Sequence, residues 1–509
     1  MSRRNGGIIG PINTPVGGLM TGVAGGVWRM NDVLTFVSNN QWPSGPQNID
    51  NSCRFEDGNN DYLVKTFVTP TNQYLYTISM WVKRSLLGSN QTLFGVGDDG
   101  SNNATLKFTA DDQIQIYDHI SGVDKLQKKT NTLLRDTSAW YHIFVSSDRS
   151  IGSPSTQIYI NGVQVTSFAA NTEYSQNDSG KFNTAVNHYL GVYTNNSEKF
   201  SGYIAEAVFV DGLALAHTDF GETDSTTGIW KPKKIGKLGD VGNNTFYLDF
   251  KDSSSLGNDA SGKNNDFTAT NLTSIDQSTD TCVENFATLN SLNVPLSNQP
   301  TFSEGNLTSI TSTDGSSKWG GCSTIGMTSG KFYCEAKATV DSTSRSVIGI
   351  TGDSTNLART SGTILNATHS WGYYSSDGAV QGNGGGNESG YSTSYTTGDI
   401  IGIALDLDNN KLYFSKNGTF LNSGDPTSGS TGTGAVSIIA ASSTNDGAYF
   451  FAQSDDTSTS AVSKFEFNFG SPPFSISSGN SDANGHGNFE YAVPSGYYAL
   501  NTSNLNTYG

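Results

Sequence analysis

The sequence predicts an all-β protein built from two β-sandwiches. Charged residues make up only 15% of the 509 residues, while glycine is abundant at 58 residues and aromatic residues reach 11%. Turn formers have thus replaced many strong helix formers, and the aromatic side chains suit half-buried, pleated surfaces. Short stretches of alternating apolar and polar residues, separated by turns, recur along most of the chain, as is typical of a sandwich. The length also exceeds that of an ordinary single domain.

The charge balance excludes one class of partner. The chain has 46 acidic and 29 basic residues, for a net charge of −17. A phosphate backbone would repel such a protein, so we expect no nucleic-acid partner. No run of about 18 apolar residues is present, so we also expect no membrane insertion.

Residues 1–46 are expected to form an irregular N-terminal arm. The segment is rich in glycine and contains Pro11 and Pro15, which are incompatible with a continuous apolar helix or a signal peptide. Several of its side chains are too apolar for a solvated tail, so we expect an anchoring peptide that becomes ordered by docking into a partner, a disordered leader being the alternative. The expected anchoring residues are Ile8, Ile9, Leu19, Met20 and Trp28.

Residues 47–222 are expected to form the first sandwich. The segments 76–82, 113–117 and 140–145 alternate with period two. The pair Asn161-Gly162 lies between two alternating stretches and favours a type I′ hairpin turn. Residues 223–309 change to a polar composition with short apolar stretches, which predicts a connector with short strands that packs on its neighbours.

Residues 310–475 are expected to form the second sandwich, followed by a C-terminal extension over 476–509. The segments 331–337, 400–407 and 411–416 alternate, and turn residues at 408–410 and 416–418 divide them into hairpins. Four scattered cysteines do not form a disulfide scaffold, and we expect buried free thiols. A single disulfide between Cys322 and Cys334, across one hairpin, is the alternative.

Two stretches resemble known families. The ordered set Phe55-x-x-Gly58, Ile78–Lys83, Trp140–Ile143, Tyr159–Gly162 and Gly202–Phe209 resembles the laminin G-like branch of the concanavalin A-like lectin/glucanase superfamily. The stretch from Lys331 through Gly398–Gly418 to Phe465–Gly470 resembles a SPRY domain. The first resemblance implies a jelly-roll sandwich with ligand sites, often with calcium, in the loops of one rim. The second implies a non-enzymatic sandwich that binds proteins or ligands through its loops.

Catalytic residues are not expected. A retaining glycosidase needs two carboxylates about 5 Å apart, one of them held protonated. The glucanase pattern of acids at alternate strand positions, Glu-x-Asp-x-Glu, does not occur, and Asp406-Leu407-Asp408 leads directly into a turn. The histidines stand singly, without the partners of a catalytic triad. We therefore expect no enzyme and no required cofactor.

The candidate binding residues combine aromatic rings with amide or carboxylate groups, which is typical of sugar recognition. A loop of oxygen-bearing side chains in the first sandwich could hold calcium, although turn formation explains the same residues. The candidate ligand contacts are Tyr373, Tyr374, Asn383, Asn387 and Glu388 in the second sandwich and Tyr193 and Asn195 in the first. The candidate calcium ligands are Asp98, Asp99 and Asn102.

The ends of the chain resemble virion structural proteins of tailed phages, especially marine ones. The resemblance rests on Gly6–Pro11, Gly26–Trp28, Trp42-Pro43 and Pro494–Thr502. It implies a protein of the virion surface, assembled in the host cytoplasm, whose arm contacts other virion proteins. It further implies a tail fibre or receptor-binding appendage, a homo-oligomer and most simply a trimer, that recognises host surface glycans or envelope proteins. A capsid decoration or head-fibre protein, and a secreted bacterial lectin or adhesin, are the alternatives.

Overall fold

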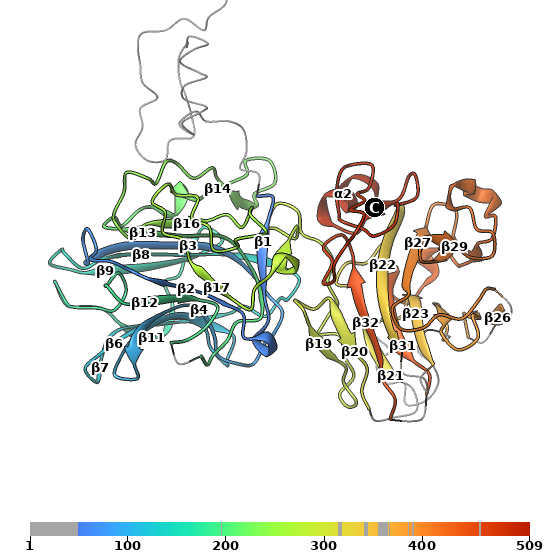
Figure 1. Cartoon of the computed structure of the whole chain (residues 1–509), viewed down its shortest axis with the longest axis horizontal. Helices are drawn as coiled ribbons and strands as arrows, with labels where there is room; N and C mark the ends of the chain where they lie inside the picture. Colours follow the sequence, from blue (N-terminus) through green and yellow to red (C-terminus); the bar gives the residue numbers. More distant parts are fainter. Residues whose placement is uncertain are drawn as a thin grey trace, which may run out of the picture.

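The structure is a computed structural model in which two β-sandwiches lie side by side (Figure 1). It describes residues 49–194, 196–313, 318–340, 345–354, 365, 367–384, 386–388, 391–457 and 460–509, without the side chains of residues 98, 99, 340 and 386–388. The predicted anchoring residues Ile8, Ile9, Leu19, Met20 and Trp28 lie outside this part. No helix in the described ranges is long and apolar enough to cross a membrane. The predicted all-β fold with two jelly-roll sandwiches is confirmed.

Two eight-stranded antiparallel sheets form the first sandwich. In the back sheet the strand order is β10 (Val163–Gln164), β9 (Ser155–Ile160), β8 (Trp140–Asp148), β3 (Leu75–Arg84), β13 (Gly202–Asp211), β1 (Ser52–Phe55) and β18 (Gln277–Ser278), with β16 (Phe246–Leu248) beside β13. In the front sheet it is β11 (Phe168–Thr172), β7 (Val123–Leu133), β6 (Gln113–Ile120), β5 (Asn102–Phe108), β4 (Gln91–Asp99), β12 (Asn187–Leu190), β2 (Tyr62–Thr66) and β17 (Thr268–Thr270).

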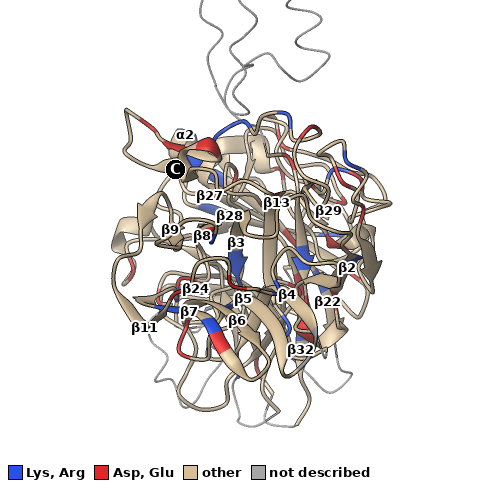
Figure 2. Cartoon of the chain, turned by 90° about the vertical axis from the view of Figure 1, so that its left-hand side faces the viewer, with Lys and Arg blue, Asp and Glu red and all other residues tan. Residues whose placement is uncertain are grey.

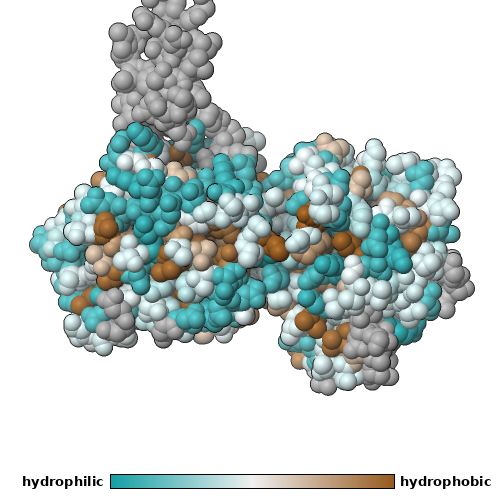
Figure 3. Space-filling model, viewed as in Figure 1, coloured by the Kyte–Doolittle hydropathy of each residue, from teal (hydrophilic) through white to brown (hydrophobic). Residues whose placement is uncertain are grey.

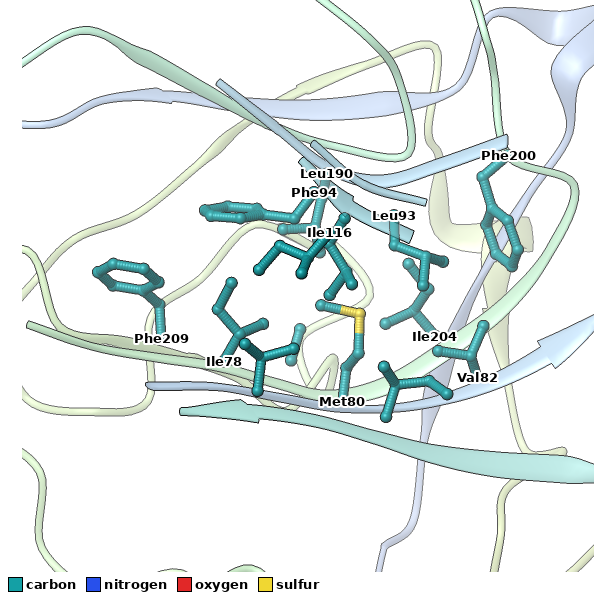
Figure 4. Close-up of a cluster of buried hydrophobic side chains, with 14 of the residues drawn as sticks. Ile78, Met80, Val82, Leu93, Phe94, Ile116, Leu190, Phe200, Ile204 and Phe209 are labelled. Atoms are coloured by element: carbon teal, nitrogen blue, oxygen red, sulfur yellow. The ribbon is translucent and has the colours of Figure 1, made fainter. Parts of the chain in front are cut away.

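The core of the first sandwich follows from the alternation in these strands. Ile78, Met80 and Val82 project from β3 toward Phe94 and Ile116 of the front sheet (Figure 4). Side chains at alternate positions share one face of a strand, so a single register buries the whole apolar set. Each fully buried side chain of this kind stabilises the fold by about 1.5–3 kcal/mol.

The back sheet is covered on its outer face as well. Phe220, Ile235 and Leu238 pack against Phe144 and Val208 of the sheet. The segment that carries them includes the 3₁₀ turn η2 (His217–Asp219) and the two-stranded pair β14 (Gly221–Thr223) and β15 (Trp230–Pro232). This cover explains why every residue of β13 is buried, although an antiparallel sheet often leaves one face to water.

The segment 223–309, expected as a connector, belongs largely to the sandwiches themselves. Its strands β16, β17 and β18 complete both sheets of the first sandwich. Its later strands β19 (Thr301–Ser303) and β20 (Thr308–Ile310) join the second sandwich. These strands have only two or three residues each, which is too short to show a period in the sequence.

The second sandwich consists of a nine-stranded and a six-stranded sheet. In the larger sheet the order is β19, β20, β32 (Ser463–Asn468), β22 (Lys331–Val340), β27 (Ile400–Asp406), β28 (Lys411–Lys416) and β29 (Thr419–Phe420), with β30 (Val436–Ser437) beside β28 and β33 (Tyr498–Ala499) beside β22. In the smaller sheet it is β21 (Lys318–Cys322), β31 (Phe450–Asp455), β23 (Ser346–Thr351), β24 (Ser370–Tyr374), β25 (Val380–Gly382) and β26 (Gly386–Glu388).

The cysteines are free, as the main expectation had it, and the disulfide alternative is wrong. Cys322 lies in β21 of the smaller sheet, whereas Cys334 lies in β22 of the larger sheet. The two residues therefore do not face each other across one hairpin. Burial raises the pKa of both thiols.

The C-terminal extension folds onto the outer face of the nine-stranded sheet. Glu335 is buried there and accepts hydrogen bonds from the backbone N–H groups of Glu490, at 2.9 Å, and Tyr491, at 2.8 Å. Phe489 and Tyr497 pack in the same area against Tyr333. The chain ends in the short helix α2 (Thr502–Tyr508), which Figure 1 places at the side of the second sandwich that faces the first.

A buried ion pair joins the first sandwich to the start of the second. Lys83 Nζ lies 2.8 Å from Asp280 Oδ2 and also donates to Asn285 Oδ1, at 2.8 Å, and to the Phe286 carbonyl, at 3.0 Å. Asp280 Oδ1 accepts a hydrogen bond from Trp140 Nε1 at 3.1 Å. Lys83 is 1% exposed, so both charges depend on these contacts in place of water.

A second contact between the sandwiches brings two glutamates together. Glu56 accepts a hydrogen bond from the Glu304 backbone N–H at 2.6 Å. Arg54, which is 1% exposed, lies between the carboxylates of Glu304, at 3.3 Å, and Asp276, at 3.6 Å. Burial, together with the nearby Asp57 and Glu304, raises the pKa of Glu56 to about 8.

We predict that Lys83→Met destabilises the protein by about 3–5 kcal/mol, because Asp280 would stay buried without its cation. Chemical denaturation of the full chain measures this loss. The matched control is Lys125→Met, because the Lys125–Asp178 pair is partly exposed and such pairs contribute about 1 kcal/mol or less. Equal losses in the two variants would contradict the structural role of the buried pair.

We also predict that the contribution of Glu56 lowers the free energy of unfolding as the pH rises from about 4.5 to 8. The folded chain keeps a proton on Glu56 up to a pKa of about 8, whereas the unfolded chain releases it at the ordinary value of 4.5. Between these values the folded state binds more protons, so the free energy of unfolding decreases with pH. Glu56→Gln removes this dependence, and we expect it to gain about 1–3 kcal/mol over the wild type between pH 5 and pH 8.

Thermal unfolding at several pH values measures this gain. The exposed Glu222→Gln is the control and is expected to follow the wild type. A constant difference between Glu56→Gln and the wild type at all pH values would refute the proposed protonation.

Candidate ligand-binding face

The outer face of the front sheet carries a cluster of polar and aromatic side chains at the tip of the β6–β7 hairpin. Ile116 of β6 points into the core, so its neighbour Tyr117 points outward, and His119 follows on the outward side. Asp124 lies opposite His119 in β7. The register of one hairpin thus places three functional groups on a single surface.

These three side chains form a compact hydrogen-bonded group, which we call the Tyr117 cluster. The Tyr117 hydroxyl donates to Asp124 Oδ1 at 2.6 Å and lies 2.9 Å from His119 Nδ1, which is itself 2.6 Å from Asp124 Oδ1. The Tyr117 and His119 rings are stacked, with centroids 5.7 Å apart. The Asp124 side chain is 44% exposed and that of His119 18% exposed, so both are open to a ligand.

The cluster has a defined protonation state. The hydrogen bond from Tyr117, followed by that from His119, lowers the pKa of Asp124. Burial and the carboxylate of Asp124 raise the pKa of Tyr117. Asp124 therefore stays ionised and Tyr117 stays neutral at physiological pH, so the cluster offers a hydrogen-bond acceptor beside an aromatic ring.

Tyr193, which the sequence predicted as a ligand contact, is half-buried in a loop close to this cluster. The loop crosses the outer face at Gly95, where a Cβ atom would lie 2.7 Å from the Val192 carbonyl oxygen and 3.5 Å from Tyr193 Cα. The absence of a side chain at Gly95 thus allows the close approach. Tyr193 contributes to the raised pKa of Tyr117, which places the two phenols near each other. Asn195 lies outside the described residues.

After Tyr193, an ion pair and a backbone hydrogen bond hold the same loop on the sheet. Glu198 Oε2 lies 2.9 Å from Lys107 Nζ, and the Glu198 carbonyl accepts a hydrogen bond from the Thr92 backbone N–H at 2.7 Å. Figure 2 shows charged residues scattered among a majority of uncharged residues in the view that includes β4–β7. No large group of charges of one sign is visible in this view.

A buried carboxylate supports β6 from behind. Asp118 points into the interior and accepts hydrogen bonds from the Tyr174 hydroxyl, at 2.7 Å, and from the Lys181 backbone N–H, at 2.9 Å. Burial raises the pKa of Asp118 to about 6. These bonds fix the segment 174–183 against the strand that carries Tyr117 and His119.

The predicted calcium ligands lie next to the cluster, at the tip of the β4–β5 hairpin. Asn102 pairs with Ile120 across the sheet, and its Oδ1 accepts a hydrogen bond from the Ser121 N–H at 3.3 Å. Asp98 and Asp99 end β4, and their side chains are not described. Within the described part of the chain, no group of three or more His, Cys, Asp or Glu side chains suits a metal ion. Calcium at Asp98, Asp99 and Asn102 stays a prediction.

The predicted ligand contacts at Tyr373 and Tyr374 are wrong. Both side chains are fully buried, because β24 lies inside its sheet and is covered on both faces. Tyr373 packs into the core against Tyr395 and Phe414, whereas Tyr374 packs on the other face with Trp319 and Val347. The aromatic pair therefore stabilises the second sandwich.

The other predicted residues of the second sandwich have separate positions. Asn383 is exposed in the turn after β25 with a φ of 51°, so turn formation accounts for it. Asn387 and Glu388 lie in β26, and their side chains are outside the described part. These two residues stay predictions.

Comparison with family models assigns a class to each sandwich. Residues 57–217 match the model described as the concanavalin A-like lectin/glucanases superfamily, and residues 331–450 match the SPRY domain model. Both resemblances seen in the sequence are thereby confirmed for these parts of the chain. The two domains are of binding type and not of typical catalytic families. Among curated proteins, none matches this sequence.

Several solved structures are similar to parts of this chain. The SPRY domain of human HERC1 is 16% identical and covers 32% of this chain and 87% of its own, with a TM-score of 0.24. A heptameric SAP-like pentraxin from Limulus polyphemus is 14% identical over 34% of this chain and 80% of its own, with a TM-score of 0.27. A protein from Bacteroides ovatus described as carbohydrate-binding is 18% identical over 45% of this chain and 62% of its own, with a TM-score of 0.29. Because all three TM-scores are below 0.5, none of these likenesses supports a conclusion about this chain.

Proposed function

We propose that the protein is a non-catalytic glycan-binding protein whose first sandwich binds sugar at the Tyr117 cluster. The observation that carries the proposal is the position of an ionised carboxylate, an imidazole and two tyrosine rings on one exposed face. The match of residues 57–217 to the concanavalin A-like lectin/glucanases superfamily supports the sugar-binding part of the proposal. Sugar sites pair an aromatic surface with a few oriented polar groups, which is the composition of this face.

The unused polar atoms of the cluster suit sugar hydroxyl groups. Asp124 Oδ1 is engaged by Tyr117 and His119, while Asp124 Oδ2 and His119 Nε2 form no hydrogen bond with a described residue. A carboxylate oxygen accepts from hydroxyl donors, and hydrogen bonds to an ionised group are the stronger ones. The rings of Tyr117 and Tyr193 would contact the apolar face of the same sugar.

Hydrolysis of the bound sugar is not part of the proposal. A glycosidase needs one carboxyl group protonated as the general acid, whereas the pKa of Asp124 is lowered. Asp118 has a raised pKa but points into the core and is fully buried, so a substrate would not reach it. The carboxylate of Glu198 forms an ion pair with Lys107, in which Oε2 lies 2.9 Å from Nζ, so it already has a partner.

We predict that Tyr117→Ala weakens binding to the best ligand of a neutral oligosaccharide array by roughly tenfold, because the ring and the hydrogen bond to Asp124 are both lost. The melting temperature should change by only a few degrees, because Tyr117 lies at the surface. Tyr498→Ala, a half-buried tyrosine on the second sandwich, is the matched control. Unchanged affinity in a folded Tyr117→Ala variant would reject this face as the binding site.

We further predict that the same oligosaccharide stays intact during prolonged incubation with the protein at neutral pH. Among the described side chains of this face, no carboxyl group combines access with a raised pKa, so none of them suits protonation of the leaving group. Mass spectrometry of the sugar measures the outcome. Cleavage that disappears in Asp124→Asn would show that the protein is an enzyme.

We also propose a finer assignment, in which a tailed phage displays this protein on its virion surface to bind host glycans. The likeness of Gly6–Pro11 and Pro494–Thr502 to virion structural proteins supports it. The arm 1–46 would contact other virion proteins, and assembly into a homotrimer would raise avidity. A tail fibre is our first choice, with a capsid decoration protein as the alternative. Electron cryomicroscopy of particles that contain the protein tests this assignment.

A further inference from the structure

A second candidate site lies at the far edge of the front sheet. A pocket of about 570 Å³ opens between the loop 253–257 and the segment 267–274, which includes the edge strand β17. The volume is within the usual range of small-ligand sites, which is about 300–1,000 Å³. The lining residues are Ser253, Ser254, Ser255, Leu256, Gly257, Phe267, Thr268, Ala269, Leu272, Thr273 and Ser274.

The lining of this pocket is neutral and rich in hydroxyl groups. No ionisable side chain lines it, although the chain carries a net charge of −17. The hydroxyl groups of Ser255, Thr268 and Ser274 form no hydrogen bond with a described residue and can serve a ligand as donors and acceptors. Leu256 and Leu272 add apolar surface. This combination suits a neutral, polyhydroxylated ring and disfavours a charged ligand.

Local hydrogen bonds hold both walls of the pocket in place. On one side, Asp252 Oδ1 accepts from the Ser254 N–H, at 3.0 Å, and hydroxyl, at 2.6 Å. On the other side, Asp276 Oδ2 accepts from the Thr273 N–H at 2.7 Å. The Phe267 N–H donates to the Gly257 carbonyl at 2.8 Å and joins the two walls. A preformed pocket loses little conformational entropy on binding.

One residue of the pocket wall, Thr268, lies on the same face of the sheet as the Tyr117 cluster. Cross-strand pairing connects Tyr117 with Thr105, Thr105 with Gly95, Gly95 with Tyr189, Tyr189 with Val64, and Val64 with Thr268. Partners in an antiparallel pair point to the same side, so Thr268 lies on the same outward row as Tyr117. Strands β6 and β17 are five positions apart in the sheet, which corresponds to about 24 Å.

Between the two ends, the loop at Val192 and Tyr193 covers Gly95, and a sugar would contact this loop and the aromatic side chains beside it. Tyr62 and Tyr189 are half-buried, and their ring centroids lie 6.2 Å apart. Together with Tyr193 they supply aromatic surface between the pocket and the Tyr117 cluster. Figure 3 shows hydrophilic and intermediate residues with scattered hydrophobic areas on the side of the molecule that faces the viewer.

We propose that the pocket is a distal subsite, and that the ligand is a linear, neutral oligosaccharide that lies across the front sheet from the Tyr117 cluster to β17. This inference rests on the proposed function and adds the length and neutral charge of the ligand. Two separated subsites on one rigid sheet make affinity depend on chain length, because only a long ligand reaches both.

The test compares ligands of two lengths on the full chain. The probes are cello-, malto-, xylo- and manno-hexasaccharides with the corresponding disaccharides, and isothermal titration measures the affinities. We expect one hexasaccharide to bind roughly tenfold or more tightly than its disaccharide. Ala269→Trp fills the pocket and should remove most of this advantage without changing disaccharide binding. Ser255→Ala combined with Thr268→Ala should reduce it by a smaller factor.

The matched control is Ala169→Trp, at an exposed position of the opposite edge strand β11. It should leave the affinity for both lengths unchanged. If folded Ala269→Trp still binds the hexasaccharide more tightly than the disaccharide, while Tyr117→Ala still weakens binding, the distal subsite is overturned. The proposed function would then remain in place. Binding that Tyr117→Ala does not affect, or wild-type protein that binds none of the neutral probes, would overturn the proposed function as well.

Discussion

The buried contact between Lys83 and Asp280 fixes the arrangement of the whole molecule. Lys83 projects from the outer face of the back sheet, and Asp280 follows directly after the last strand of the first sandwich. Two more acceptors, Asn285 and the Phe286 carbonyl, complete the surroundings of the ammonium group. A buried charge without such partners would cost several kcal/mol, so the chain between the sandwiches has one favourable path. The position of the second sandwich follows from that path.

Additional contacts extend this constraint along the junction. The Tyr203 hydroxyl donates to the Gly305 carbonyl at 3.0 Å, and Ser278 and Ser471 share a hydrogen bond of 2.6 Å. The Ala287 N–H donates to the Leu500 carbonyl, which joins the end of the chain to its middle. The extension 476–509 therefore closes the junction and is an integral part of the second sandwich.

The sequence predicted the long strands well because their side chains alternate over many residues. β3 and β22 show this period clearly, whereas β16, β17 and β18 have only two or three residues each and were assigned to a connector. Tyr374 was misjudged because alternation identifies two faces of a strand but not which face is covered. In β24 both faces are covered, and Tyr374 packs with side chains of other strands, such as Val347 of β23 and Trp319 of β21.

Of the residues at the candidate site, only Tyr193 was predicted from the sequence. Tyr117, His119 and Asp124 were missed because their meeting depends on the register of the β6–β7 hairpin, and two irregularities shift that register. A signal was present in the sequence: Tyr117 and His119 lie two positions apart in a strand whose apolar partners occupy the opposite parity. That pattern places both rings on the solvent face. The neutral pocket had no such signal, because serine and threonine are equally common in ordinary turns.

The packing of Ile49 has a mechanical consequence. Ile49 lies in a cluster with Trp81, Trp140 and Tyr203 on the outer face of the back sheet, so the described part of the chain begins on the first sandwich. The proposed sugar-binding face belongs to the same sandwich, on the far side of its core. Tension between a tether at this end and a bound glycan would pass from the back sheet through the apolar core to the front sheet. The second sandwich would not carry this tension. Its surface would therefore keep its conformation while force acts on the first sandwich.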